Sequence, residues 1–259
     1  MFAGERGGSA LNRIELLAYL TDLDENLLNG YVPVDLSLFS LKEFTAAVEI
    51  MNEVFEADLS FSRLADVISL GEKLGGVPVP EGMVGLVTVS SVIINGSFLK
   101  AGIPVDSCFG GMLQVRDRKQ LRFVDLIKYE GSSLHPYEIF IASRITDVLG
   151  VIRRGTGKVL ASFHEIPMFS MPSVLRIIDR LKESGLCNTV TTGRPSGSVC
   201  EMPVRYNNTG LLLLGGLNPV AAAVEAGINV TCKAMSGIIN VRRLKDFSEI
   251  QEEYGRRGG

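Results

Sequence analysis

The spacing of apolar residues in the first 70 positions predicts a strand, a helix and a second strand. Apolar and polar residues alternate over Tyr31–Phe39, as in a half-buried strand. Ser40-Leu41-Lys42-Glu43 has the form of a capping box, and apolar residues then recur at helical spacing, at Leu41, Phe44, Val48, Met51 and Phe55. A helix is therefore expected from Leu41, with a returning strand within residues 58–70 and a separate helix over Leu11–Leu20.

The middle of the chain favours hairpins. A Gly/Pro-rich break at residues 75–82 is a candidate hinge, and the stretch Val84–Ile94 is typical of a strand. Asn95-Gly96 then predicts a tight hairpin, with Phe98–Lys100 starting the returning strand. The remaining elements expected here are a Gly110-Gly111 turn, strands at 112–115 and 123–129, and a short helix from Pro136 with His135 beside its N-cap.

The second half has a regular order of strands and helices. Strands are expected at 158–165, 187–192, 211–214 and 229–235, with helices at 172–184 and from Pro219, and an edge strand around 199–206. This order is the split βαβ arrangement of ferredoxin-like domains. We therefore predict an α+β fold of two lobes with ferredoxin-like plaits and an added hairpin-rich sheet. The predicted divisions are an N-terminal segment (1–30), a first lobe (31–150) and a second lobe (151–259).

The strand-turn-helix at residues 211–227 is the strongest candidate for a binding site. Four leucines form a buried strand, Gly215 and Gly216 turn it, and Asn218 is placed to cap a helix that begins at Pro219. The first N–H groups of such a helix, together with its dipole, favour a phosphate or a carboxylate. The alternative is a plain strand-to-helix connection in which the glycines only allow close packing.

Positive side chains could complete such an anion site. Lys233 follows the predicted helix on the next strand, and Lys100 ends the predicted hairpin, although either lysine could simply lie on the surface. The candidate residues for binding an anionic effector are Lys100, Gly110, Gly111, Gly215, Gly216, Asn218 and Lys233. Arg144 and Arg194 are further cations that could meet an anion.

Composition and motifs exclude several classes of protein. The 259 residues carry a net charge of −3, which does not suit a nucleic-acid-binding surface. The four cysteines are too far apart in sequence for a metal knuckle or a redox pair, and no stretch of about 18 apolar residues could span a bilayer. No secretion signal opens the chain, so a cytoplasmic protein is expected. No nucleophile elbow, phosphate loop or zinc motif occurs, and neither a metal nor a cofactor is expected.

Several segments together resemble the regulatory domain of the archaeal nitrogen-regulation repressor NrpR. They are Val84–Lys128 with Leu99–Val105 and Phe109-Gly110-Gly111, Tyr129-Glu130-Gly131, Gly157–Ala161 into Glu165-Ile166-Pro167, Gly215–Ala222 and Lys233–Gly237. Each motif is weak alone, whereas their order and number are fairly specific. The resemblance covers roughly residues 30–250. His135 stands where an acidic N-cap is expected in the family.

The resemblance implies a sensor of nitrogen starvation. Members of the family repress nitrogen-assimilation genes, and 2-oxoglutarate binds their regulatory domain and weakens DNA binding. A homodimer is expected because palindromic operators suit a two-fold protein. Residues 1–30 are too short for a winged helix, so DNA contact is expected to come from a separate winged-helix domain or a partner chain.

Two other classes of function stay open at this point. A small-molecule enzyme could use Glu130 or Glu165 as a general base, which would require a carboxyl of raised pKa in a cleft. A ligand-free assembly domain would instead have a dry core and no polar site near Gly110 or Gly215.

Overall fold

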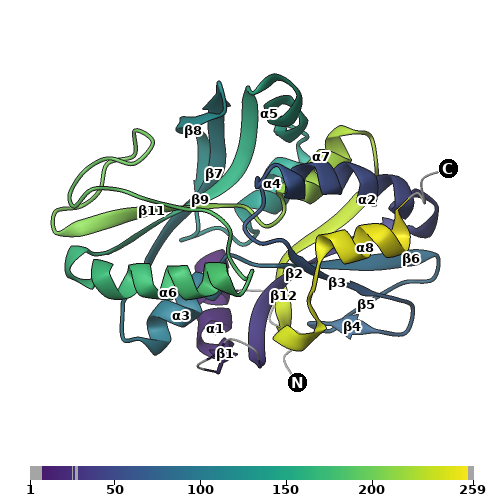
Figure 1. Ribbon diagram of the computed structural model, residues 1–259, viewed down its shortest axis with the longest axis horizontal. Coiled ribbons are helices and arrows are strands. Elements are labelled where there is room, and N and C mark those ends of the chain that lie inside the picture. Colours follow the sequence, from purple (N-terminus) through teal and green to yellow (C-terminus); the bar gives the residue numbers. More distant parts are fainter. Residues whose placement is uncertain (1–7, 25, 27–28, 256–259) are drawn as a thin grey trace.

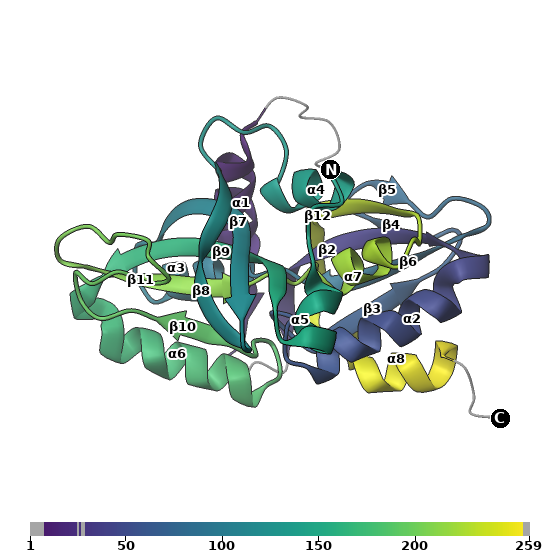
Figure 2. The same ribbon diagram turned by 90° about the horizontal axis from the view of Figure 1, so that it is seen from above.

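Two antiparallel sheets lie side by side in the computed structural model, with helices packed around them (Figures 1 and 2). The structure describes residues 8–24, 26 and 29–255. Residues 1–7, in which no secretion signal is expected, lie outside this part. The mixture of helices and sheets confirms the predicted α+β class. Within the described residues, no helix combines the length and the apolar character needed to cross a membrane.

The first sheet has six strands. Its order is β1 (Asp22–Leu23), β2 (Gly30–Ser40), β6 (Met83–Val89), β3 (Leu64–Ile68) and β13 (Lys245–Asp246), with β12 (Val230–Asn240) also paired to β2. The second sheet has five strands. Its order is β10 (Val190–Thr192), β11 (Asn208–Leu214), β9 (Gly157–Pro167), β7 (Asp106–Arg116) and β8 (Lys119–Lys128). A small hairpin pairs β4 (Lys73–Leu74) with β5 (Val77–Pro78).

The helices cover the sheets and connect them. They are α1 (Ala10–Leu20), α2 (Leu41–Glu56), α3 (Val92–Lys100), α4 (Pro136–Ala142), α5 (Val148–Arg154), α6 (Met171–Glu183), α7 (Asn218–Glu225) and α8 (Phe247–Tyr254). In the core, α7 packs beside α2, and α3 contacts α6. Each pair thus combines one helix from the first half of the chain with one from the second half.

The two sheets exchange segments. The chain forms β2, α2, β3 and β6 of the first sheet, then crosses to the second sheet through α3 and β7. It forms β9, α6, β10 and β11 there, and returns through α7 and β12, which pairs with β2. Each half therefore follows the order of a split βαβ unit, but gives its last helix and strand to the sheet of the other half.

The sheets consequently divide the chain differently from the predicted lobes. β7 and β8 precede residue 150 but belong to the second sheet, where β7 pairs with β9 and β8 pairs with β7. α7 and β12 follow residue 150, but α7 packs against α2 and β12 pairs with β2 of the first sheet. The predicted lobes 31–150 and 151–259 were drawn from the order of strands and helices along the chain. The structure has the predicted order in the second half, except for the strand expected around 199–206. That segment forms only an isolated bridge between Val199 and Met202. Periodicity gives the type of an element, and not the sheet that it joins.

One predicted hairpin is wrong. Residues 92–100 form α3, although Asn95-Gly96 is a strong hairpin signal and three β-branched residues precede it. The reason is tertiary packing: a Cβ at Gly96 would lie 2.3 Å from Thr21 Cβ, so glycine lets α3 approach the end of α1. Asn95 is buried, and its amide donates to Ser107 Oγ at 2.8 Å.

Candidate functional site

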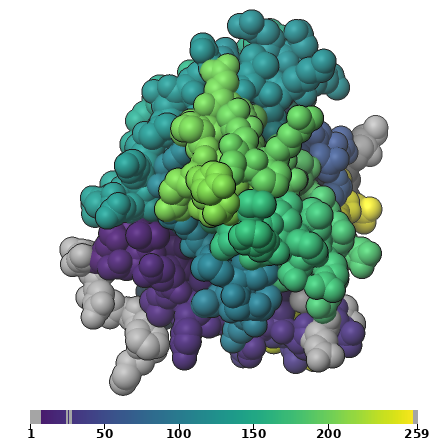
Figure 3. Space-filling model, turned by 90° about the vertical axis from the view of Figure 1, so that its left-hand side faces the viewer, coloured from purple at the N-terminus to yellow at the C-terminus, as the bar shows by residue number. Residues whose placement is uncertain are grey.

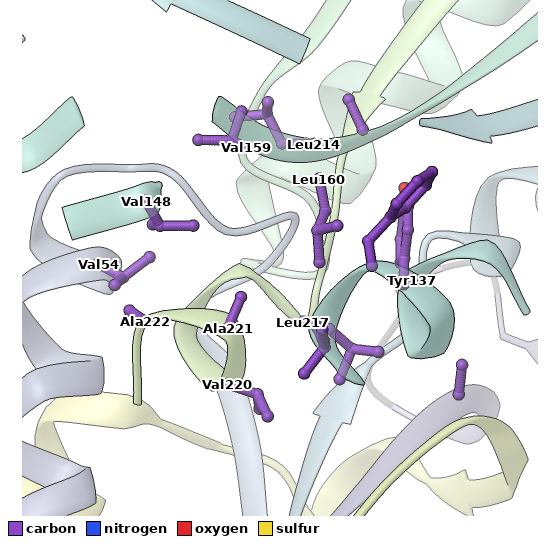
Figure 4. Close-up of a cluster of buried hydrophobic side chains, with 14 of the residues drawn as sticks. Val54, Tyr137, Val148, Val159, Leu160, Leu214, Leu217, Val220, Ala221 and Ala222 are labelled. Atoms are coloured by element: carbon purple, nitrogen blue, oxygen red, sulfur yellow. The ribbon is translucent and has the colours of Figure 1, made fainter. Parts of the chain in front are cut away.

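The start of α7 is closed to solvent. Gly215, Gly216, Leu217 and Asn218 are all buried, and Figure 4 shows Leu217 packed near Leu160 and Tyr137. The prediction that Asn218 caps this helix is wrong, because Leu217 precedes the first turn and no side chain caps it. Gly227 follows the C-cap of the helix with a φ of 94°, which favours glycine at the end of a helix.

Asn218 instead joins the start of α7 by hydrogen bonds to the backbone at Leu59 and at Leu160. Its Oδ1 accepts a hydrogen bond from the Leu160 amide at 2.8 Å. Its Nδ2 donates to the carbonyl oxygens of Leu59 at 2.8 Å and Leu160 at 3.0 Å. The side chain is fully buried, and its hydrogen bonds are therefore structural.

A carboxylate from the chain itself lies where an external anion was expected. Asp35, in the middle of β2, has its Oδ2 3.6 Å from the position that a Cβ of Gly216 would take. Its Oδ1 accepts a hydrogen bond from the Met235 amide at 2.7 Å, and it is also bonded to the side chain of Ser90. Ser90 stands just before α3. Asp35 thus lies between the starts of α3 and α7, the two helices that cross between the sheets.

Other buried polar groups surround Asp35. We call the set Asp35, Ser90, Tyr129, Tyr137, Ser162 and His164 the central polar cluster. His164 bonds through Nε2 to Ser162 Oγ at 3.0 Å and through Nδ1 to Ser107 Oγ at 3.1 Å. The Tyr137 hydroxyl is buried and interacts with the Ser162 side chain.

Burial controls the protonation of the cluster. It raises the pKa of Asp35 to about 7, against the opposing effect of the hydrogen bonds from Met235 and Ser90. Burial also lowers the pKa of His164 to about 4 and that of His135 to about 3. It raises the pKa of both tyrosines above the ordinary value. Near neutral pH the centre therefore holds neutral rings, hydroxyls and one carboxyl close to its titration midpoint.

Charged side chains lie on the outer side of the cluster, around an irregular part of β12. The pairing of β12 with β2 shifts register between Lys233 and Gly237, and Met235 has a φ of 50° there. Arg13 Nε donates to the Met235 carbonyl at 2.6 Å, and Glu138 Oε1 accepts from the Ala234 amide at 2.7 Å. Arg13 acts electrostatically on Asp35 and Glu138, and the exposed Lys233 acts on Glu138.

The structure brings together only some of the seven predicted site residues. A Cβ at Gly110 would lie 3.1 Å from the Tyr129 hydroxyl, and one at Gly215 would lie 3.1 Å from the Tyr137 ring. With Gly216, these glycines border the central polar cluster. Gly111 instead faces the Asp125 carbonyl and the Phe123 ring.

Neither predicted lysine enters this centre. Lys100 lies at the exposed end of α3, with its Nζ 3.9 Å from Asp22 Oδ1, and Lys233 is exposed on the outer side of β12. Asn218 is held by hydrogen bonds to backbone groups, as described above. The seven residues therefore do not line one open cleft in this conformation.

Two hollows on the surface contain the other cations named from the sequence. One, of about 340 Å³, is lined by Arg144 and Glu43 with apolar residues of β12 and the α7 end. The other, of about 500 Å³, is lined by Arg194, Thr191, Thr192 and Ser198, at the end of the molecule that faces the viewer in Figure 3. Neither hollow is lined by a residue of the central polar cluster.

Glu165 does not have the character of a general base. Arg205 Nε donates to its Oε2 at 2.8 Å, and Asn208 Nδ2 donates to the same oxygen at 2.9 Å. Although burial acts in the opposite direction, hydrogen bonds from Asn208 and Arg205 lower the pKa of Glu165. A carboxylate kept ionised in this way is poorly suited to abstract a proton. Glu130, the other candidate, is exposed.

The fold and its centre define a protein of two interlocked ferredoxin-like sheets around a buried polar cluster. The family model for the NrpR regulatory domains NRD1 and 2 matches residues 8–246. The chain therefore belongs to this family of regulatory domains from nitrogen regulators.

Curated relatives agree with this assignment. The chain is 31% identical over 244 residues to the global nitrogen regulator NrpRI of Methanosarcina mazei, covering 94% of the chain and 75% of that protein. It is 25% identical over 229 residues to the global nitrogen regulator NrpR of Methanocaldococcus jannaschii and 26% identical over 255 residues to that of Methanococcus maripaludis. These two matches include 88% and 97% of this chain, but the chain spans only 38% and 44% of the length of the two relatives.

A solved structure supports the fold. The crystal structure of a nitrogen repressor-like protein from Methanococcus jannaschii matches with a TM-score of 0.77 at 23% identity. The match covers 93% of this chain and 99% of that one. The same architecture therefore extends over nearly the whole of both chains.

Proposed function

We propose that this chain is the effector-sensing part of a cytoplasmic repressor of nitrogen-assimilation genes, with 2-oxoglutarate as its effector. The observation that carries the proposal is the match of the NrpR regulatory domains to residues 8–246. DNA binding would be supplied by a separate winged-helix domain or partner chain. The net charge of −3 supports this division, because a surface that holds DNA directly is usually basic.

Binding without turnover is the first expected result. Millimolar 2-oxoglutarate should raise the melting temperature of the protein, because a ligand that binds only the folded state stabilises it. Glutarate, which lacks the keto group, and succinate, which is also shorter, should give smaller shifts. Calorimetry should show saturable heat, and 2-oxoglutarate should be recovered unchanged. A folded protein that gives neither heat nor a thermal shift would refute the proposed effector.

A homodimer is the second part of the proposal. β8 is the outer strand of the second sheet, ten residues long, and it leaves Val124 and Leu126 exposed. An outer strand offers unpaired backbone groups to a second copy, and although Lys119, Arg122, Asp125 and Lys128 also lie on β8, the exposed Val124 and Leu126 would be covered by pairing there. A two-fold axis would then join the second sheets of two protomers.

Leu126→Lys is expected to shift the protein from dimer to monomer, since a lysine on the paired edge adds a charge to the interface. Light scattering after size exclusion measures the mass. Leu175→Lys on α6 is the matched control, because Leu126 and Leu175 are each 44% exposed. A monomeric wild-type protein, or a Leu126→Lys variant that remains dimeric, would argue against this edge as the interface.

A further inference from the structure

We propose that a surface hollow near the end of α4 binds an α-amino acid with an apolar side chain. The hollow, of about 340 Å³, is lined by residues from the start of α2, the ends of α4 and α7 and the starts of β6 and β12. We call it the Arg144–Glu43 hollow, after the two charged residues in its described lining. It is separate from the central polar cluster, so it adds a second class of ligand that does not depend on the proposed effector.

The first observation is that two opposite charges line this hollow without a protein partner. Neither Arg144 nor Glu43 has an ion pair or a side-chain hydrogen bond within the part of the chain that the structure describes. The two groups therefore do not neutralise each other across the hollow. Glu43 is half-buried, so its carboxylate has lost part of its hydration without gaining a cation. A molecule that carries both charges could pair with both residues.

The second observation is the backbone conformation of Arg144. The helix α4 has Ser143 as its C-cap, and Arg144 follows with a φ of 53°, in the left-handed region. Glycine is the usual residue at this position, because a side chain is strained there. The Arg144 side chain makes no bond within the described residues that would offset this strain. Strain of this kind is typical of residues that serve binding and not folding.

The third observation is the apolar character of the remaining wall. The apolar lining residues are Met83, Ile141, Ala142, Val224, Ile228 and Val230. Ile141, Val224 and Ile228 are buried and belong to the hydrophobic core, so this part of the wall is held in place by packing. A largely apolar wall with a few polar groups, in a hollow of this volume, is the usual form of a small-molecule site.

An α-amino acid combines the three features that the hollow calls for. Its carboxylate can accept two parallel hydrogen bonds from the guanidinium of Arg144, and its ammonium group can donate to Glu43. An apolar side chain would cover the apolar wall and remove it from water. A dicarboxylate such as 2-oxoglutarate lacks the cation that Glu43 requires and would bring a second anion towards it, so it is not expected here.

Calorimetry on the whole chain tests the ligand class. L-Leucine, L-methionine and L-phenylalanine are the probes, and L-leucine has two analogues that each lack one charge. The first is 4-methylpentanoate, without the ammonium group, and the second is 3-methylbutylamine, without the carboxylate. L-Leucine should give saturable heat, and both analogues should bind at least tenfold more weakly. No saturable heat with any of the three amino acids, or equal affinity for the analogues, would overturn the proposal.

Two variants test the place of binding. Arg144→Gln and Glu43→Gln should each weaken the Kd for L-leucine about tenfold or more. Arg144→Gln should also remove the preference for L-leucine over 3-methylbutylamine, and Glu43→Gln should remove the preference over 4-methylpentanoate. A variant that only disturbed the fold would weaken all three ligands together. Far-UV circular dichroism checks that the variants are folded.

Each variant has a matched control. Arg194→Gln changes an arginine that lines the other hollow, whose described lining contains no carboxylate. Glu249→Gln changes an acidic residue in the first turn of α8, as Glu43→Gln does in α2, so both remove the same kind of charge near a helix start. Both controls should bind L-leucine as the wild type does. Unchanged affinity in Arg144→Gln or Glu43→Gln, or an equal loss in the controls, would show that the hollow is not the site.

Discussion

Asn218→Ala is expected to lower the free energy of unfolding by about 3–5 kcal/mol, enough to unfold a domain of ordinary stability near its growth temperature. The variant leaves the Leu160 amide and the carbonyls of Leu59 and Leu160 without the partners that Asn218 supplies. The site is fully buried, so water cannot replace these hydrogen bonds without entering the core.

Urea unfolding followed by far-UV circular dichroism measures this change. Asn52→Ala is the matched control, because Asn52 pairs with Glu56 on the surface of α2, at 2.9 Å, and its loss should cost less than about 0.5 kcal/mol. If Asn218→Ala lowers the free energy of unfolding as little as the control does, the hydrogen bonds of Asn218 do not hold α7 in place.

The type of most elements could be predicted, because it depends on local pattern. Ser40 caps α2 through the Lys42 amide at 3.3 Å, as the capping box indicated, and Gly185 and Gly227 end their helices at positive φ. Residues 92–100 could not be predicted, since the decisive fact is the approach of Thr21 to Gly96, and Thr21 is 75 positions distant in sequence. The exchange of α3–β7 and α7–β12 between the sheets could not be predicted either, because it also depends on contacts between residues far apart in sequence.

The candidate site was predictable in its glycines and not in its polar groups. Gly110, Gly215 and Gly216 border the cluster because close backbone approach requires glycine there. Asp35 was missed as a candidate. An aspartate between Val34 and Leu36 in a mostly apolar strand indicates a buried carboxyl, and this signal was available in the sequence. Tyr129 and Ser162 carried no such signal, because each is an ordinary strand-end or strand residue until the two sheets are placed together.

The same centre predicts how stability depends on pH. Folding raises the pKa of Asp35 from 3.8 to about 7, so the folded protein holds this proton more tightly than the unfolded chain. The stability that this protonation contributes is present at low pH and is lost as the pH rises from about 4 to 7. His135 and His164 act in the opposite sense: folding lowers their pKa from 6.5 to about 3 and about 4, so stability is lost as the pH falls below 6.5. The wild-type protein should therefore be most stable at pH 6–7.

Asp35→Asn separates these contributions, since both proteins contain the same histidines. Relative to the wild type, the variant should gain about 2–3 kcal/mol between pH 5 and pH 8, because it has no buried carboxyl to ionise. Urea unfolding at pH 5, 6.5 and 8 measures the difference between the two proteins at each pH. Asp179→Asn, whose carboxyl lies on the exposed face of α6, should follow the wild type throughout. A difference that stays constant with pH would show that Asp35 is ionised in the folded protein across the range, and the electrostatic picture of the centre would have to be reversed.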